Sequence, residues 1–209
     1  MPPNRKYEKY FQRQGFELIA GLDEVGVGSL AGPVLAAAVI LPPKAKIPGL
    51  NDSKKLSAQQ REKLFPLIIK QALGIGVGIV DWGLIDRINI LKASHLAMRL
   101  AAEVLKPRPD FLLIDGKYPV KSPLPQLSLC GGDLRCVSIA AASVVAKVIR
   151  DRIMRRFDQM FPAYGFKKNA GYGTRRHLKQ LKNNGPCLIH RRSYLPVSQI
   201  LLDFEPRPR

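Results

Sequence analysis

The chain has 209 residues, the size of one ordinary domain, and is long enough to bury a core without disulfide bonds or a structural metal. With 46% hydrophobic and 24% charged residues, its composition is globular and excludes disordered, collagenous and membrane classes. Lys and Arg number 34 against 16 Asp and Glu, giving a net charge of +18 that favours nucleic acid as the partner. The same charge also fits a solvated surface or a scaffold of the ribosomal kind.

The cysteines and apolar segments bear on where the protein resides. Cys130, Cys136 and Cys187 form no CxxC pair and lack histidines at zinc-site spacing, so we expect neither a disulfide framework nor a structural zinc site. The apolar run at residues 34–41 is far too short to span the ~30 Å hydrocarbon core of a membrane. We expect a cytoplasmic protein without export signal or membrane anchor. We also expect a monomer.

Five segments have the apolar or alternating pattern of β-strands, and the first two predict an antiparallel pair joined by a Gly-rich turn. One helix opens at a capping box that begins with Ser57, and others cover residues 90–105 and 137–157. We predict two more helices, from near Thr174 and after Pro196. The order predicts an α/β fold, a mixed sheet with helices on its faces. The strands are predicted at residues 16–22, 34–41, 74–80, 111–114 and 127–130.

Four acidic residues lie next to apolar strands, where an ionised carboxylate is costly unless a positive charge compensates it. Asp23 and Glu24 end the first strand, Asp115 ends the fourth, and Asp133 precedes the long helix. Carboxylates brought to one sheet edge suit two-metal phosphoryl chemistry with Mg²⁺. Strand alternation places Asp23 and Glu24 on opposite faces, so both serve one site only if the backbone bends near Gly26. Alternatively, these acids are turn residues, helix caps or ion-pair partners.

Two further features suit contacts with phosphates. In the Gly-rich segment 26–32, backbone N–H groups can approach a phosphate or hydroxyl because glycine lacks Cβ; the alternative is a tight hairpin turn. On the long helix, Ser143, Lys147 and Arg150 are spaced i, i+4 and i+7 and form a polar stripe. That stripe either contacts phosphates or is the solvated side of a core helix, with Lys147 paired to Asp151.

Seven motifs, taken in order, are specific where each alone is not. They are LDEVG at 22–26 with LAGPV at 30–34, NDSKKLS at 51–57, IDG at 114–116, GD at 132–133, SIAAAS at 138–143 with AKV at 146–148 and RD at 150–151, GYGT at 171–174 with His177, and HR at 190–191 with Ser193. With these motifs the chain resembles bacterial ribonuclease HII, the type 2 ribonuclease H, over nearly its whole length.

The resemblance implies the ribonuclease H fold, a mixed five-stranded sheet flanked by helices. It implies one catalytic domain over residues 1–209, in which residues 174–209 form a C-terminal helical part that completes the substrate groove. The implied activity is hydrolysis of the RNA strand of RNA/DNA hybrids and cleavage 5′ to single ribonucleotides in duplex DNA, leaving 3′-OH and 5′-phosphate ends. The implied cofactor is Mg²⁺ or Mn²⁺, used in two-metal-ion hydrolysis. The implied catalytic and metal-binding residues are Asp23, Glu24, Asp115 and Asp133.

The resemblance also implies nucleic-acid contacts. Gly26, Val27 and Gly28 correspond to the loop that reads the ribonucleotide 2′-hydroxyl, the group that distinguishes RNA from DNA. Tyr172 corresponds to the ring that stacks on the adjoining deoxyribose, although on its own a tyrosine in a Gly-Tyr-Gly turn would be a surface residue. Phosphate-side contacts are implied for Lys54, Ser143 and Lys147.

Three positions depart from the family pattern. Val27 stands where the family has arginine, and Gly131 and Ala170 stand where lysine is usual or frequent. Loss of the arginine removes a charge-assisted contact worth about 1.5 to 3 kcal/mol. The backbone amides of the loop remain, so we expect the chemistry to persist while affinity or junction choice changes.

Two other functions remain open from the sequence. One is a related carboxylate-metal nuclease that cuts DNA, and the other is a non-catalytic protein that binds hybrids, which Val27 makes conceivable.

Near the C-terminus, residues 199–204 (QILLDF) resemble the short Gln-plus-apolar peptides by which bacterial replication proteins bind the sliding clamp. The alternative is a terminal amphipathic helix whose Ile200, Leu201 and Phe204 pack on the body.

Overall fold

The sheet is built around an antiparallel pair, β1 (Ile19–Val25) and β2 (Val34–Ile40), as the sequence predicts. β3 (Gly74–Val80) pairs antiparallel with β2, whereas β4 (Phe111–Asp115) pairs parallel with β1, and β5 (Gln126–Leu129) pairs parallel with β4. The strand order is β3-β2-β1-β4-β5, so the predicted mixed five-stranded sheet is confirmed. The computed structural model describes residues 2–204.

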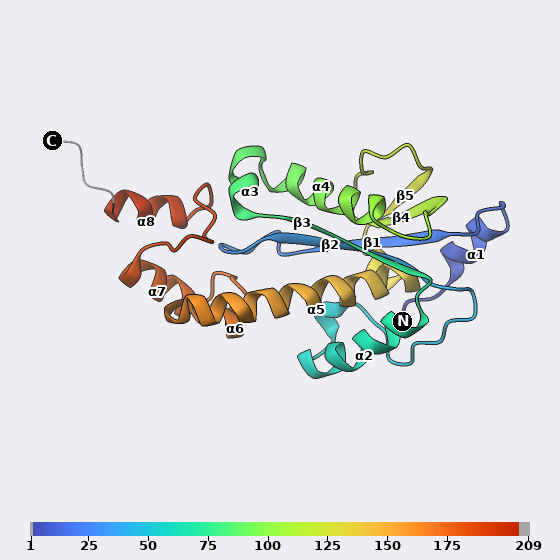
Figure 1. The fold of residues 1–209 in the computed structure, drawn as a ribbon, viewed down its shortest axis with the longest axis horizontal. Helices are drawn as coiled ribbons and strands as arrows, with labels where there is room; N and C mark the ends of the chain where they lie inside the picture. The colour runs from blue at the N-terminus through green and yellow to red at the C-terminus, as the bar shows by residue number, and fades with distance from the viewer. Residues whose placement is uncertain (1, 205–209) are drawn as a thin grey trace.

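Helices cover both faces of the sheet (Figure 1). α3 (Trp82–Ile88) and α4 (Ile90–Glu103) lie on one face, and α2 (Ala58–Gln71) and α5 (Val137–Met160) lie on the other. Every residue of β2 is buried because its alternating side chains enter the two cores on opposite sides of the sheet. The capping box at Ser57 marks the start of α2, and the helices predicted at residues 90–105 and 137–157 are present as α4 and α5.

The glycines of β3 explain how α4 packs so closely. A Cβ added at Gly76 or Gly78 would collide with the backbone carbonyl of Ala101 or Ala97 on α4. The alternating glycines therefore let the backbone of α4 lie directly on β3.

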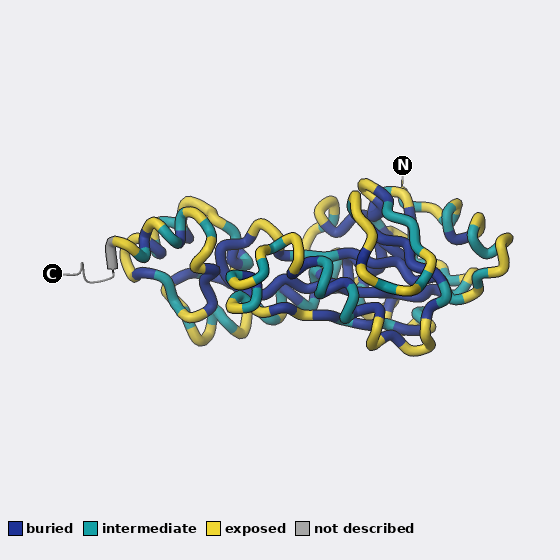
Figure 2. Tube along the Cα trace, turned by 90° about the horizontal axis from the view of Figure 1, so that it is seen from above, coloured by how far each residue is buried: buried dark blue, intermediate teal, exposed yellow. Residues whose placement is uncertain are grey.

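A separate core lies in the C-terminal part, around η3 (Pro162–Tyr164), α6 (Phe166–Asn169), α7 (Arg175–Asn184) and α8 (Val197–Phe204). Figure 2 shows buried segments continuing from the sheet into this part of the elongated molecule. α5 belongs to both regions, because Val144 and Val145 face the sheet core and Met154 lies in the C-terminal core. This helix therefore sets how the two parts are joined.

The boundaries of β1 differ from the prediction. Its pairing with β2 continues without interruption to Val25 opposite Leu35, and ends before Gly26, which has a φ of +92°. Asp23 and Glu24 consequently lie inside the strand rather than at its end. The bend that would bring both onto one face is absent from this paired stretch.

Three of the described α-helices were not predicted: the N-terminal α1 (Lys6–Gln12), α3 and α6. α1 and α3 have seven residues and α6 has four, too few for a clear helical period. α1 is held by aromatic packing, in which Phe11 stacks on Phe111 with ring centroids 3.9 Å apart.

The terminal helix is present as α8, with Ile200 buried and Leu202 exposed. The side chain of Phe204 and residues 205–209 lie outside the described part, so the predicted packing of Phe204 stays a prediction. Across residues 2–204, no helix has the length and apolar character needed to cross a membrane. The three cysteines are free thiols.

Candidate active site

Three carboxylates converge at one edge of the sheet. Asp23 comes from the interior of β1, Asp115 is the last residue of the parallel neighbour β4, and Asp133 lies in the short η2 turn (Gly132–Leu134) before α5. Each offers an oxygen, and these oxygens all lie within 4.8 Å of one another. The Gly132 N–H donates to Asp115 at 2.7 Å, which ties the η2 turn to the end of β4.

Glu24 lies on the other side of the strand. It lines a small cavity of about 120 Å³ together with His95 and Met98 of α4, and Asp115 lines the same cavity. The backbone N–H of Glu24 donates to Asp23 at 2.8 Å, and its own Oε2 is buried without a hydrogen-bond partner. Asp115 therefore adjoins both the group of three and Glu24.

Burial and neighbouring negative charge raise the pKa values of all four carboxyl groups. Burial first, and the charge of Asp115 second, raise the pKa of Glu24 to about 7 and the pKa of Asp133 to about 6. The same two causes, in the same order, raise the pKa of Asp23 well above its ordinary value. Burial also raises the pKa of Asp115, against the effect of the Gly132 N–H. The cluster thus carries more negative charge than its surroundings stabilise.

Lys54 faces this cluster, with its Nζ 3.6 Å from Asp133. Its side chain is 78% exposed, so a screened surface charge is all that it contributes. Closely spaced carboxylate oxygens without a buried counter-charge are the donor set that hard divalent cations prefer. The residues present therefore fit one or more ions such as Mg²⁺ or Mn²⁺.

The glycine-rich loop between β1 and β2 is held from inside by a buried arginine. Arg191 donates to the carbonyls of Gly26, Val27 and Gly32 at 2.6, 2.8 and 3.0 Å. Val27 and Gly28 remain exposed at the loop tip. The loop is thus fixed by its carbonyls, while its tip faces solvent.

Arg150 has the same kind of role, and this corrects the interpretation of the polar stripe on α5. Its guanidinium is fully buried and donates to the hydroxyl of Ser29 at 2.7 Å and to the carbonyls of Pro33 and Ala170 at 3.0 and 2.9 Å. Because the guanidinium is buried and donates to these groups, it cannot contact phosphates. Sequence spacing could not reveal it, because every partner is distant in the chain.

The other two residues of the stripe lie closer to the chemistry. The Ser143 hydroxyl donates its hydrogen to the Ser53 hydroxyl at 2.8 Å. Lys147 pairs with Asp151 at 2.7 Å, the alternative that the sequence left open. Its Nζ nevertheless lies 5.8 Å from the ring centroid of Tyr172.

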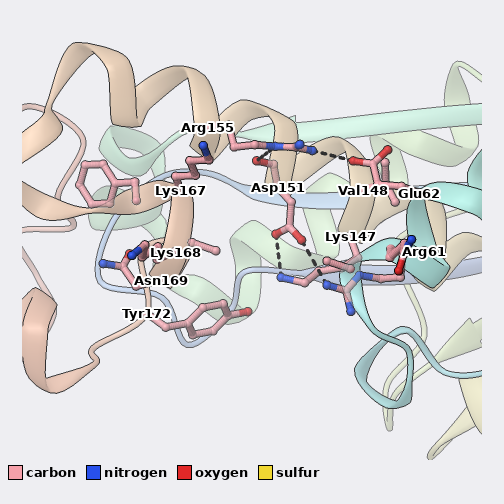
Figure 3. A pocket seen from close by; sticks show the side chains of 14 residues that line it. Arg61, Glu62, Lys147, Val148, Asp151, Arg155, Lys167, Lys168, Asn169 and Tyr172 are labelled. Carbon is pink, nitrogen blue, oxygen red and sulfur yellow. Dashed lines mark hydrogen bonds and ion pairs between the residues drawn. The ribbon is translucent and has the colours of Figure 1, made fainter.

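A hollow of about 670 Å³ adjoins this part of α5 (Figure 3). α2, α5, α6 and the Tyr172 turn line it, and basic side chains dominate its walls. Arg61 and Arg155 are engaged by Asp151 and Glu62, as the dashed lines show. Lys147 and Tyr172 border the hollow side by side, with the Lys147 Nζ 5.8 Å from the centroid of the Tyr172 ring, and the basic walls suit a phosphate backbone. The other basic residues at its walls are Lys167 and Lys168.

Two of the three departures from the family pattern have a positive φ. Gly131 has a φ of +64° at the start of η2, and Ala170 has a φ of +49° at the end of α6. Val27 is 37% exposed, so its side chain is free to vary while its carbonyl stays bound to Arg191.

Asp52 is a site residue that sequence reasoning missed. It is buried, caps the η1 turn (Ser53–Lys55) by accepting from the Lys54 N–H at 2.8 Å, and its charge raises the pKa of Asp133. It stands in the NDSKKLS motif, but no apolar strand precedes it, so the signal that marked the other acids was absent.

Comparisons with known proteins identify the family. The family model described as ribonuclease HII matches residues 20–197. The ribonuclease HII of Listeria innocua is 51% identical over 201 residues, which cover 96% of this chain and 77% of that protein. The ribonuclease HII of Syntrophotalea carbinolica is 52% identical over 195 residues, 93% of each chain.

Solved structures give the same result. The ribonuclease H2 of Pyrococcus horikoshii OT3 has a TM-score of 0.75 and 26% identity, covering 89% of this chain and 98% of that one. The ribonuclease HII in a PCNA complex from Archaeoglobus fulgidus has a TM-score of 0.68 and 28% identity, covering 85% and 96%. The family match and the two relatives confirm the resemblance carried by the seven motifs, and the chain belongs to the ribonuclease HII family of ribonuclease H enzymes.

Proposed function

We propose that this protein is a divalent-metal-dependent endoribonuclease that hydrolyses the RNA strand of RNA/DNA hybrids and cleaves 5′ to single ribonucleotides in duplex DNA. The products would carry 3′-OH and 5′-phosphate ends. One observation carries the proposal: three carboxylates from separate elements meet within 4.8 Å on a protein with a net charge of +18. A protein that only bound nucleic acid would have no use for this buried negative cluster beside its basic groove.

Each carboxylate has a place in this proposal. Asp23, Asp115 and Asp133 would hold one Mg²⁺ or Mn²⁺, and Glu24 with Asp115 would hold a second. When bound, two such ions supply an activated water and stabilise the leaving oxygen. The Gly132 N–H orients Asp115. Lys54 would meet the phosphate next to the scissile one, since its exposed side chain reaches beyond Asp133.

Substrate reading would come from the glycine loop and the Tyr172 turn. The loop tip, Gly26 to Gly28, would contact the ribonucleotide 2′-hydroxyl through its backbone, and the Tyr172 ring would stack on the following deoxyribose. Lys147 and the C-terminal helical part, residues 174–209, would line the path of the phosphates. Support comes from the way Arg191 fixes the loop and from the basic hollow beside Tyr172.

A panel of three labelled duplexes tests this function: all-DNA, DNA with one ribonucleotide, and an RNA/DNA hybrid, each with Mg²⁺ and with Mn²⁺. We expect cutting of the second and third only, and none by Asp115→Asn, whose amide keeps the shape of the side chain but loses its charge. Cleavage of the all-DNA duplex alone would indicate the DNA nuclease instead. Tight binding without turnover in either metal would indicate the hybrid-binding protein.

A sliding-clamp partner is a second proposal, favoured by the PCNA complex of the Archaeoglobus fulgidus relative. Leu202 is 71% exposed and available, but Ile200 packs in the C-terminal core, so α8 would have to release it on docking. The test is clamp binding by the full chain and by Leu202→Ala. We expect Leu202→Ala to weaken binding; no binding by the full chain would end this proposal.

A further inference from the structure

Two buried histidines connect the Cys187 loop to the turn that carries Tyr172. His177 of α7 and His190 face each other with their Nε2 atoms 3.1 Å apart, and both are at most 1% exposed. The Nδ1 of His190 accepts from the backbone N–H of Cys187 at 2.9 Å. The Nδ1 of His177 lies 3.0 Å from the carbonyl oxygen of Tyr172.

The backbone groups at the two ends of this row of hydrogen bonds, the Cys187 N–H and the Tyr172 carbonyl, determine which ring nitrogens carry hydrogen. The backbone N–H of Cys187 only donates, and it lies 2.9 Å from His190 Nδ1. The Cys187 carbonyl is farther from that nitrogen, at 3.3 Å, and already accepts from the His190 N–H at 3.1 Å, so we take His190 Nδ1 as the unprotonated nitrogen. The Tyr172 carbonyl only accepts, so His177 Nδ1 carries the hydrogen. With both rings neutral, the hydrogen on His190 Nε2 then points at the bare Nε2 of His177. The polarity runs one way, from Cys187 through His190 and His177 to Tyr172, and adding a proton to either ring would place two donors face to face.

The surroundings favour this neutral pair. Tyr164 and Phe166 pack edge-on against the His177 ring, and Tyr164 does so against His190. Two further titratable groups contact the pair, the phenol of Tyr164 and the thiol of Cys187, whose Sγ lies 3.1 Å from His190 Nδ1. Burial lowers the pKa of His177, and burial together with His177 lowers the pKa of His190 to about 4.

At its Tyr172 end, this row of hydrogen bonds reaches the hollow beside α5. The carbonyl of Tyr172 accepts from both the Thr174 N–H, at 2.8 Å, and His177, so both of its lone pairs are used. One residue earlier, the carbonyl of Gly171 accepts from the N–H of Leu30 in the glycine-rich loop at 2.8 Å. The turn is therefore tied to the loop on one side and to the histidines on the other. The Tyr172 ring projects from between these two anchors beside Lys147 (Figure 3).

We propose that His177 and His190 are positioning residues: as a neutral pair of fixed tautomers they hold the Tyr172 carbonyl, and thereby set the ring for substrate discrimination. This role rests on the proposed function only in that Tyr172 reads the sugar next to the ribonucleotide. Neither histidine touches the substrate or the carboxylates.

The tautomers are tested first, by ¹⁵N NMR of the histidine-labelled full chain at pH 7. We expect His177 to be protonated on Nδ1 and His190 on Nε2, with both still neutral at pH 6. A charged ring at pH 6, or the opposite tautomer at either position, would overturn the proposal.

The positioning role is tested by the ratio of kcat/KM for a single-ribonucleotide duplex to kcat/KM for a long hybrid. His177→Leu removes the bond to Tyr172, and we expect the ratio to fall about five-fold, as for the loss of one hydrogen bond. His177→Asn places an amide donor near the former Nδ1, so it should retain most of the ratio. Leu181→Ala is the matched control, because Leu181 is fully buried one turn further along α7 and should lower stability without changing the ratio.

The Tyr172→Ala background separates this proposal from the proposed function. If the histidines act through Tyr172, then His177→Leu should change nothing further in that background; an equal fall there, or an unchanged ratio in the otherwise native chain, would overturn the proposal. A native ratio in Tyr172→Ala alone would instead remove Tyr172 from substrate reading. In that case the positioning role is tested by the NMR resonances of the Tyr172 ring in the chain that retains Tyr172. We expect them to shift in His177→Leu and not in Leu181→Ala; no shift in His177→Leu would overturn the proposal.

Discussion

Asp23 shows, at the scale of one residue, how a metal site opposes stability. Its pKa is raised by burial and by Asp115, so ionisation of Asp23 as the pH rises destabilises the fold when no cation is bound. We expect Asp23→Asn to raise the unfolding free energy of the metal-free protein by about 1–2 kcal/mol. The same change should abolish cleavage. Urea unfolding in EDTA at pH 7.5, beside an activity assay, measures both; a less stable but active variant would contradict the account.

His190 contributes a pH dependence of opposite sign to that of the carboxylates. Its folded-state pKa of about 4 lies below the ordinary 6.5, so only the unfolded chain gains this proton as pH falls below 6.5, and stability is lost toward pH 4. Between pH 7.5 and pH 5, protonation of His190 in the unfolded chain lowers the unfolding free energy by about 2 kcal/mol. The carboxyl groups, with raised pKa values, add stability over the same range. The quantity to measure is therefore the unfolding free energy of the native chain minus that of His190→Asn at each pH. We expect it to be about 2 kcal/mol smaller at pH 5 than at pH 7.5; an equal value at both would show that His190 titrates normally.

Val27 is the departure that bears most directly on substrate reading. Its side chain is exposed while its carbonyl stays on Arg191, so the loop should accept Val27→Arg without rearrangement. The added guanidinium should tighten binding to a single-ribonucleotide duplex by about 1–2 kcal/mol, with a steeper salt dependence. Fluorescence anisotropy at two salt concentrations measures this. Unchanged affinity would mean that other groups already replace the arginine, and Val27→Ala serves as the neutral control.

At the scale of elements, the packing of α4 on β3 depends on missing Cβ atoms. Gly78→Ala would place a methyl group against the Ala97 carbonyl, so it should destabilise the protein by about 3 kcal/mol or more. Gly83→Ala is the matched control, because an alanine Cβ there would meet only the side chain of Asp81, at 3.3 Å, which can shift where a backbone carbonyl cannot, so the effect on stability should be much smaller. Thermal unfolding of the two variants checks this; equal melting temperatures would refute the close-packing explanation.

Elements with strong local signals could be predicted from the sequence. The alternating glycines matched β3, Gly74–Val80, and the capping box matched the start of α2. β1 was placed three residues too early, because its end is set by pairing with β2 and by the backbone of Gly26 rather than by polarity. α1 was missed because its polar sequence becomes helical only when Phe11 packs on Phe111.

At the scale of the whole molecule, the acids of the candidate site could be anticipated, because charged residues beside buried strands are costly without a purpose. The groups that hold the site together could not. Arg150 and Arg191 bind carbonyls more than 100 residues away in the chain, and these contacts leave no local pattern. His177 and His190 were visible as parts of motifs, but only the fold places their rings in contact.

The central claim joins the carboxylate cluster, the glycine loop and Tyr172 in one activity. The measurement that tests it most directly is mapping of the cut in a duplex with a single ribonucleotide, with Mg²⁺ or Mn²⁺ and with Asp115→Asn as control. The account predicts one cut on the 5′ side of the ribonucleotide, with 3′-OH and 5′-phosphate ends, and none with the variant. A cut elsewhere, other end groups, or undiminished cleavage by Asp115→Asn would contradict it.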